Sequence, residues 1–145
     1  MTAYTVIIPA RYGASRLPGK PMLDLAGKPV IQHVIDRALE SGAIRVVVAT
    51  DDARIEQAAI DGGAQAVLTR ADHQSGTDRI AQAAQILSLP DDEIIINVQG
   101  DEPDMPPELI RQMADALADN TTIAMCTACA PITNTDIIHD PGVVK

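Results

Sequence analysis

The chain has 145 residues, of which 46% are hydrophobic, and its formal net charge is −9. This length suits one domain with a substantial core, whereas the excess of acidic residues excludes a broad nucleic-acid-binding surface. No apolar run is long enough to span a bilayer and no signal-peptide pattern is present, so we expect a cytoplasmic protein without membrane or nucleic-acid partners.

Strand-like and helix-like segments alternate along the chain. In chain order, apolar runs predict five strands at Tyr4–Ala10, Ile44–Thr50, Ala66–Thr69, Glu93–Val98 and Thr122–Cys129. Apolar residues at helical spacing predict helices over residues 31–39, 52–61 and 80–87 and from Pro106–Pro107 onward. The run Ile94–Ile96 predicts that the fourth strand is buried on both faces.

Strands that alternate with helices predict an α/β fold, in which a mostly parallel sheet has helices on both faces. In such sheets ligands bind beyond the carboxyl ends of the strands, where the strand order reverses. Residues 132–145 show no clear helix or strand, and the chain stops just after Val143–Val144. We therefore expect a truncated protein.

Cys126 and Cys129 have the Cys-x-x-Cys spacing of a redox pair or of half a zinc site. On a strand, however, residues three apart face opposite sides, and the chain has no other cysteine. We therefore expect buried, reduced structural thiols. Because Phe and Trp are absent, we also expect an aliphatic core.

A basic loop over residues 11–20, here called the opening loop, follows the first predicted strand. It holds two glycines and three cations, namely Gly13, Gly19, Arg11, Arg16 and Lys20. Glycines let backbone N–H groups approach a triphosphate, and the cations supply positive charge. The loop has neither the spacing of a Walker A motif nor that of a dinucleotide fingerprint. A simple connecting loop with solvated side chains is the alternative, but so many cations in an acidic chain favour a polyanion site.

Two further polar clusters follow predicted strands. In Asn97–Pro103, Asp101 is a candidate Mg²⁺ ligand, because Mg²⁺ takes one or two carboxylates together with phosphate oxygens; a polar turn before the next helix is the alternative. Gln99 could orient a hydroxylated substrate. In Arg70–Arg79, Ser75 opens a capping-box pattern, and His73 is either solvated or ligand-facing. The segment Thr50–Asp52 is most simply a helix N-cap.

Together, the segments Ile7–Pro21, Arg70–Arg79 and Asn97–Pro103 closely resemble the 3-deoxy-manno-octulosonate cytidylyltransferases of Gram-negative lipopolysaccharide synthesis. The resemblance runs through the whole chain but covers only the N-terminal part of a longer enzyme. It implies a Rossmann-like nucleotidyltransferase fold, in which residues 1–145 are the N-terminal nucleotide-binding part of a single domain whose C-terminal part is absent. The implied reaction converts CTP and 3-deoxy-manno-octulosonate to the CMP-sugar and pyrophosphate.

The resemblance also implies roles for particular residues. Ala10, Arg11, Ser15 and Lys20 would hold the triphosphate, Arg70, Ser75 and Gly76 would lie against cytidine, Gln99 would touch the sugar acid, and Asp101 would bind Mg²⁺. Arg11, Lys20 and Asp101 would be the catalytic residues. In the family, a second metal carboxylate, much of the sugar pocket and a large part of the dimer contact come from the C-terminal half, so we expect a homodimer in the full-length protein.

Other readings of these residues stay open. A CMP-sialic acid synthetase or another sugar nucleotidyltransferase would run the same chemistry on a different acceptor. A non-catalytic nucleotide-binding module would bind CTP without releasing pyrophosphate, and a flavodoxin-like scaffold would bind no CTP.

Overall fold

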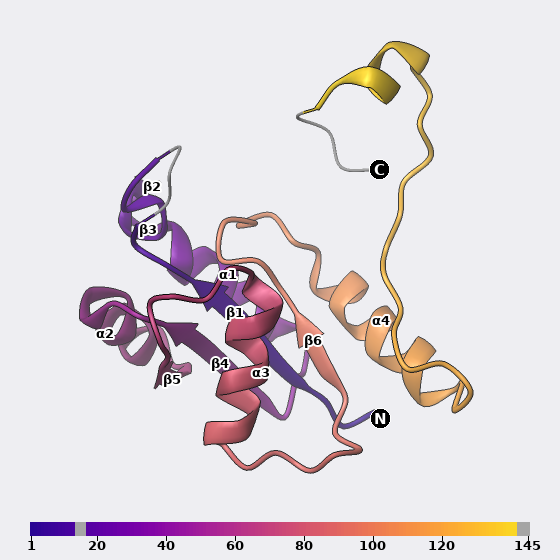
Figure 1. Ribbon diagram of the computed structural model, residues 1–145, viewed down its shortest axis with the longest axis horizontal. Coiled ribbons are helices and arrows are strands. Elements are labelled where there is room, and N and C mark those ends of the chain that lie inside the picture. The colour runs from indigo at the N-terminus through magenta and orange to yellow at the C-terminus, as the bar shows by residue number, and fades with distance from the viewer. Residues whose placement is uncertain (14–16, 142–145) are drawn as a thin grey trace.

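The computed structural model describes residues 1–13 and 17–141. Its main sheet has four parallel strands in the order β5-β4-β1-β6, comprising β1 (Thr5–Ala10), β4 (Arg45–Thr50), β5 (Gln65–Leu68) and β6 (Ile95–Asn97) (Figure 1). The predicted α/β class and parallel sheet are therefore confirmed. No helix in the described part of the chain is long and apolar enough to cross a membrane.

Helices cover both faces of the sheet. The helices α1 (Val30–Glu40), α2 (Ala53–Asp61) and α4 (Pro107–Ala118) pack on one face, and α3 (Gly76–Ile86) packs on the other. Figure 1 shows α3 lying across the strands. Side chains alternate along each strand, so that Val6 and Ile8 join the first core cluster while Ile7 joins the second. As predicted, this core is largely aliphatic; Tyr4 joins it and donates its hydroxyl to Ser41 O at 2.6 Å.

The helix ends follow local sequence signals. Asp52 caps α2 by accepting the N–H of Arg54, and Ser75 caps α3 by accepting the N–H of Asp78. The predicted cap within Thr50–Asp52 and the capping role of Ser75 are thus confirmed. Gly63 follows the end of α2 with a φ of +85°, a conformation that suits glycine.

The order of the strands reverses around β1. The chain adds β4 and then β5 on one side of β1, and then crosses back to place β6 on the other side. Loops after β1 and β6 therefore meet at the carboxyl edge of the sheet, where parallel α/β proteins form their ligand sites.

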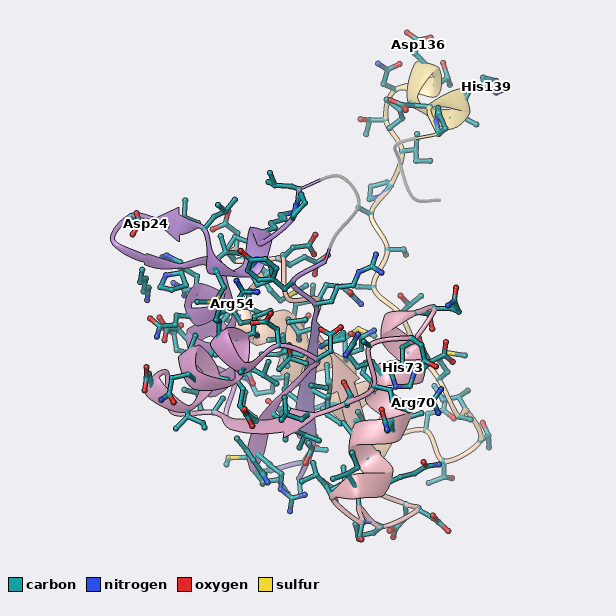
Figure 2. All side chains as sticks on the ribbon, turned by 60° about the vertical axis from the view of Figure 1, so that its left-hand side comes forward. Asp24, Arg54, Arg70, His73, Asp136 and His139 are labelled. Atoms are coloured by element: carbon teal, nitrogen blue, oxygen red, sulfur yellow. The ribbon has the colours of Figure 1, made fainter. Side chains whose placement is uncertain are left out.

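The main sheet and its helices are flanked by short elements that the sequence did not predict. The 3₁₀ helix η1 (Lys20–Met22) leads to a hairpin of β2 (Asp24–Leu25) and β3 (Lys28–Pro29). Near the other end of the chain, a long extended segment leads away from the sheet to a second 3₁₀ helix, η2 (Thr135–His139), which carries Asp136 and His139 (Figure 2).

The predicted fifth strand is wrong: in the part of the chain that the structure describes, residues 122–129 form no strand. This segment lies over α4, where the Cys126 thiol meets Met113 O at 3.6 Å, and a strand requires backbone pairing that this contact does not supply. The thiols are also less buried than predicted, since Cys126 is half-buried and Cys129 exposed; both are free, as expected.

A further correction concerns β6, which forms the edge of the sheet. Within the described ranges it pairs with β1 alone, and of Ile94, Ile95 and Ile96 only Ile96 is fully buried. The prediction of burial on both faces therefore holds only in part, since Ile96 is buried in the first core cluster while Ile95 is half-buried against the second. An apolar run does not reveal how completely each face of a strand is covered.

Candidate functional site

A small cavity of about 180 Å³ lies at the carboxyl edge of the sheet. Three segments line it: the end of β1, the loop and first turn of α3, and the loop after β6. The lining residues are Pro9, Ala10, Arg11, His73, Gln74, Ser75, Gly76, Arg79 and Gln99. Its volume is below the roughly 300–1,000 Å³ that encloses a drug-sized ligand, so it suits one part of a nucleotide, such as a base.

Close packing of two glycines shapes this cavity. A Cβ atom at Gly76 would lie 3.2 Å from Pro9 Cγ and 3.6 Å from Gln99 Oε1. At Gly100 it would lie 3.0 Å from Pro9 O and 3.1 Å from Ala10 Cβ. The absence of side chains there lets the loops after β1 and β6 and the start of α3 approach one another.

The two ends of the opening loop meet beside the cavity. Gly19 has a left-handed φ of +74° and donates its N–H to Tyr12 O at 2.8 Å, which brings the two ends of the loop together. Lys20 follows, and its Nζ lies 2.9 Å from Asp101 Oδ2. Ser15, a predicted phosphate contact, lies outside the described residues.

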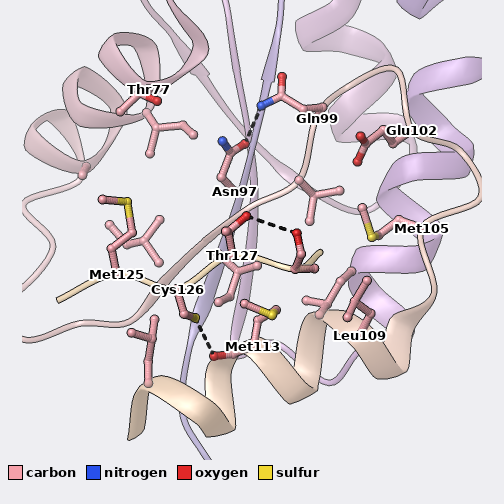
Figure 3. A pocket seen from close by; sticks show the side chains of 18 of the residues that line it. Thr77, Asn97, Gln99, Glu102, Met105, Leu109, Met113, Met125, Cys126 and Thr127 are labelled. Atoms are coloured by element: carbon pink, nitrogen blue, oxygen red, sulfur yellow. Dashed lines mark hydrogen bonds between the residues drawn. The ribbon is translucent and has the colours of Figure 1, made fainter. Parts of the chain in front are cut away.

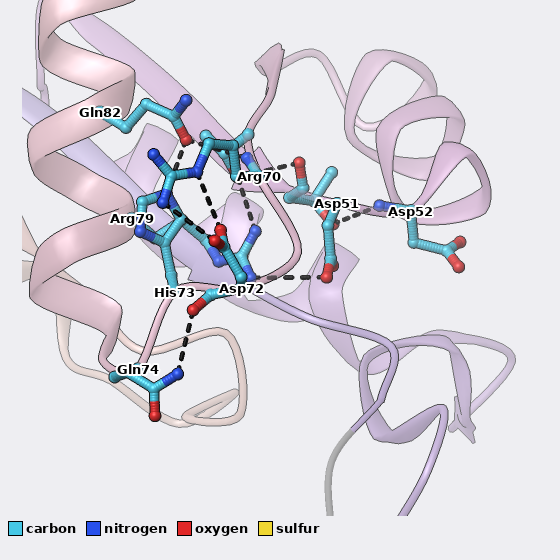
Figure 4. A network of polar contacts seen from close by, with 10 residues as sticks. Asp51, Asp52, Arg70, Asp72, His73, Gln74, Arg79 and Gln82 are labelled. Atoms are coloured by element: carbon cyan, nitrogen blue, oxygen red, sulfur yellow. Dashed lines mark hydrogen bonds and ion pairs between the residues drawn. The ribbon is translucent and has the colours of Figure 1, made fainter.

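The loop before α3 carries an exposed ion pair. Arg70 binds both carboxylate oxygens of Asp72 at 2.8 and 3.0 Å (Figure 4). These hydrogen bonds lower the pKa of Asp72 and raise that of Arg70. Gln82 Oε1 accepts the backbone N–H of Arg70 and lies 2.6 Å from His73 Nε2, which ties this loop to α3.

The structure brings most of the predicted site residues together. Ala10, Arg11, Ser75, Gly76 and Gln99 share the small cavity, and Lys20 and Asp101 form a pair next to it. Arg70 does not line the cavity, because its guanidinium turns to Asp72 on the outer side of the loop.

Sequence reasoning missed Arg79. Its side chain is only 4% exposed, lines the cavity and donates to Thr69 Oγ1 at 2.6 Å, with Asp51 Oδ2 at 3.5 Å (Figure 4). The other oxygen of Asp51 is buried without a hydrogen-bond partner among the described residues. A signal was present, since Arg79 sits one position before the apolar Ile80 of the predicted helix, but arginine is so rarely buried that this pattern alone does not predict its burial.

A larger, mostly apolar hollow of about 660 Å³ lies on the other side of Gln99, between α3, β6, α4 and residues 124–128. Figure 3 shows Met105, Met113 and Met125 around it. Gln99 lines both cavities and donates to Asn97 Oδ1 at 3.0 Å. The smaller cavity is the better candidate for the nucleotide, because Arg11 and Arg79 line it, whereas the larger one has no cation among its described lining residues.

The acidic residues after β6 suit Mg²⁺ on chemical grounds. No group of three or more His, Cys, Asp or Glu side chains gathers to hold a metal ion in residues 1–13 and 17–141. Mg²⁺ does not need such a cage, since it usually binds one or two carboxylates and takes its other ligands from phosphates and water. Asp101, exposed beside Lys20, fits that role.

Fold and site together define a doubly wound α/β protein whose site combines a basic loop after the first strand with a carboxylate beyond the last. Residues 5–145 match the profile of the family described as Cytidylyltransferase, and the chain belongs to that family. Two relatives described as 3-deoxy-manno-octulosonate cytidylyltransferase are similar over nearly the whole chain. The protein from Halorhodospira halophila is 58% identical over 99% of this chain and 56% of its own length, and that from Hahella chejuensis is 57% identical over 100% and 57%.

A solved structure described as CMP:2-keto-3-deoxy-manno-octonic acid synthetase complexed with CTP has a similar fold. It is 46% identical, with a TM-score of 0.77, over 84% of this chain and 50% of its own. The chain thus spans about half the length of the curated relatives it matches.

Proposed function

We propose that the protein is a 3-deoxy-manno-octulosonate cytidylyltransferase, which transfers CMP from CTP to the sugar acid with release of pyrophosphate, for lipopolysaccharide synthesis. The observation that carries this proposal is the pairing of Lys20 with Asp101, a phosphate-binding type of cation next to a metal-binding type of carboxylate. Family membership and the names of the relatives support it.

The two cavities suggest where each substrate binds. The small cavity would take the cytosine base between the end of β1 and the start of α3, with Ser75 and Gly76 against the nucleoside. Gln99, which faces both cavities, would orient the sugar acid from the larger hollow towards the nucleotide. Its amide has both donors and acceptors and so suits a hydroxylated acceptor.

Catalysis would consist mainly of positioning and charge neutralisation. Arg11 and Lys20 would offset the charge on the phosphates while the anomeric hydroxyl of the sugar attacks the α-phosphorus and pyrophosphate leaves. Asp101 would hold Mg²⁺, and the bound ion would offset negative charge on the phosphates. Because CTP is a cytoplasmic metabolite, the protein would act in the cytoplasm, and the resemblance to the family supports a homodimer for the whole protein.

Calorimetric titration of the protein with CTP and Mg²⁺, alongside the Lys20→Ala variant, tests the nucleotide site. We expect binding that is largely lost in the variant. A folded protein that binds no CTP, or a variant that binds as well as the original, would contradict the proposed site.

Transfer is then tested in the whole protein by following pyrophosphate release with 3-deoxy-manno-octulosonate and with a sialic acid. Release with the first acceptor only is the expected result. Saturation with CTP but no release with either acceptor would identify a binding module instead. Lys20→Ala should lower turnover on the order of 10²- to 10³-fold.

A further inference from the structure

The ring of Tyr12 lies between two parts of the molecule that are separate in sequence. The Arg54 guanidinium carbon lies 3.5 Å from the centre of the ring. The phenolic end of the ring lies against Gly19, where an added Cβ atom would come within 3.0 Å of Tyr12 Cζ and Oη. The ring therefore links the start of α2 to the far end of the opening loop.

Arg54 is itself held in place. Its Nε and Nη2 atoms donate to the two oxygens of Asp52 at 2.9 and 2.6 Å, and its backbone N–H donates to Asp52 Oδ1 at 2.9 Å. The side-chain hydrogen bonds lower the pKa of Asp52 and raise that of Arg54. Asp52 caps α2 directly after β4, so the guanidinium is tied to a rigid element of the fold. A planar guanidinium group held in this way is well suited to stack on an aromatic ring.

The other end of the contact leads to the candidate site. Gly19 N–H donates to Tyr12 O, and Tyr12 packs against the main core cluster. The left-handed φ of Gly19 sets the direction of the chain at Lys20, the first residue of η1, whose ammonium group reaches Asp101. A side chain at position 19 would collide with the Tyr12 ring, so the ring and the glycine depend on each other.

We propose that Arg54, stacked on Tyr12 and anchored by Asp52, is a positioning residue that holds Gly19 in place and so directs Lys20 towards Asp101. Neither Arg54 nor Tyr12 is among the site residues that the sequence analysis named. In the proposed function, on which this part of the inference rests, the stack orders Gly19 and Lys20 before CTP arrives, and binding then costs less conformational entropy.

Arg54→Met tests the stack, because it removes the cation and keeps an unbranched side chain. Hydrogen exchange of the Gly19 amide, measured by NMR without ligand, should become about two- to fivefold faster, as expected for loss of an exposed cation–π contact. CTP binding measured by calorimetry should weaken by a similar factor. Arg54→Lys keeps the positive charge but lacks the planar guanidinium group. Its Gly19 exchange rate and its CTP affinity should therefore lie between those of Arg54→Met and the original protein.

Arg37→Met is the matched control, because Arg37 is also an exposed arginine in an ion pair, with Glu40 at 2.8 Å on α1. It should leave Gly19 exchange and CTP binding unchanged. Exchange of the Ala49 amide in the central strand β4 reports global stability, so a selective change at Gly19 is a local effect.

The two proposals have separate outcomes. Unchanged Gly19 exchange in Arg54→Met would overturn the positioning role, whatever happens to CTP binding. Faster exchange in a protein that binds no CTP would support the positioning role and contradict the proposed function. Tyr12→Leu combined with Arg54→Met should add little to either single change, and simple additivity would also overturn the inference.

Discussion

The ammonium group of Lys20 lies 2.9 Å from the carboxylate of Asp101, although 81 positions separate the two residues in the sequence. Their side chains are 40% and 52% exposed. An exposed ion pair of this kind contributes only about 0–1 kcal/mol to stability, so either partner can turn to a ligand at low cost. A ligand could therefore open this ion pair, so that Lys20 contacts a phosphate and Asp101 binds a divalent cation.

Asp101→Asn should reduce the effect of Mg²⁺ on CTP affinity, because an amide is a weaker ligand for a hard cation than a carboxylate. The free energy of unfolding should change by less than about 1 kcal/mol. Calorimetric CTP titrations with and without Mg²⁺ provide the measurement. Asp119→Asn, at the exposed end of α4, is the control. A full Mg²⁺ effect in Asp101→Asn would argue against this carboxylate as the ligand.

Gly100→Ala should lower the free energy of unfolding by about 1–3 kcal/mol. The new Cβ would meet Pro9 O at 3.0 Å, and the backbone of the central strand β1 cannot easily move away. Urea denaturation measures the change. Gly13→Ala, whose Cβ would meet no atom within 4 Å, is the stability control. Equal stability of the two variants would show that the loop after β6 can shift.

Arg79→Met should destabilise the protein by about 1.5–3 kcal/mol, because it removes the charged hydrogen-bond donor of Thr69 and the ion-pair partner of Asp51. Adding Asp51→Asn should restore part of this loss, since the remaining polar group is then uncharged. Arg37→Met, from an exposed pair, should cost less than about 1 kcal/mol. Urea denaturation of the original protein, the two single variants and the double variant tests this order of stabilities. A double variant no more stable than Arg79→Met would refute the coupling between Arg79 and Asp51.

The Asp52–Arg54 contact predicts a dependence of stability on pH. The side-chain hydrogen bond from Arg54 lowers the pKa of Asp52 in the folded protein. The resulting stabilisation is present above the unfolded value of about 3.9 and is lost as the pH falls through the lower folded value. Asp52→Asn, which keeps a capping oxygen, should therefore lose less stability between pH 5 and pH 3 than the original protein. Equal losses of stability in the two proteins over this pH range, measured by urea denaturation, would contradict this assignment.

Local patterns predicted much of the secondary structure. The positions of α1 to α4 follow from helical spacing and from signals such as Asp52, Ser75 and Pro107. These signals act between residues a few positions apart, so the sequence is enough to detect them. The hairpin of β2 and β3 escaped notice, because strands as short as Asp24–Leu25 have no measurable period.

Patterns of the same kind failed where a segment depends on a distant partner. Residues 122–129 have strand-like composition, but no neighbouring strand pairs with them in the described part of the chain. Likewise the isoleucines of β6 predicted a strand buried on both faces, whereas β6 lies at the edge of the sheet and, among the described residues, pairs with β1 alone. Strand propensity shows only that a segment can adopt the extended conformation. Whether it forms a strand depends on backbone pairing with a neighbouring strand.

The sequence by itself determined the alternation of strands and helices, the aliphatic core and the motifs of the cytidylyltransferase family. Only the tertiary structure decided that β6 crosses back beside β1, which brings Gly100 against Pro9 and lets Lys20 meet Asp101. It also decided that Arg79 is buried and that Arg54 stacks on Tyr12. These contacts join residues far apart in the chain, and their geometry depends on strand order and helix packing, which local sequence preferences do not specify.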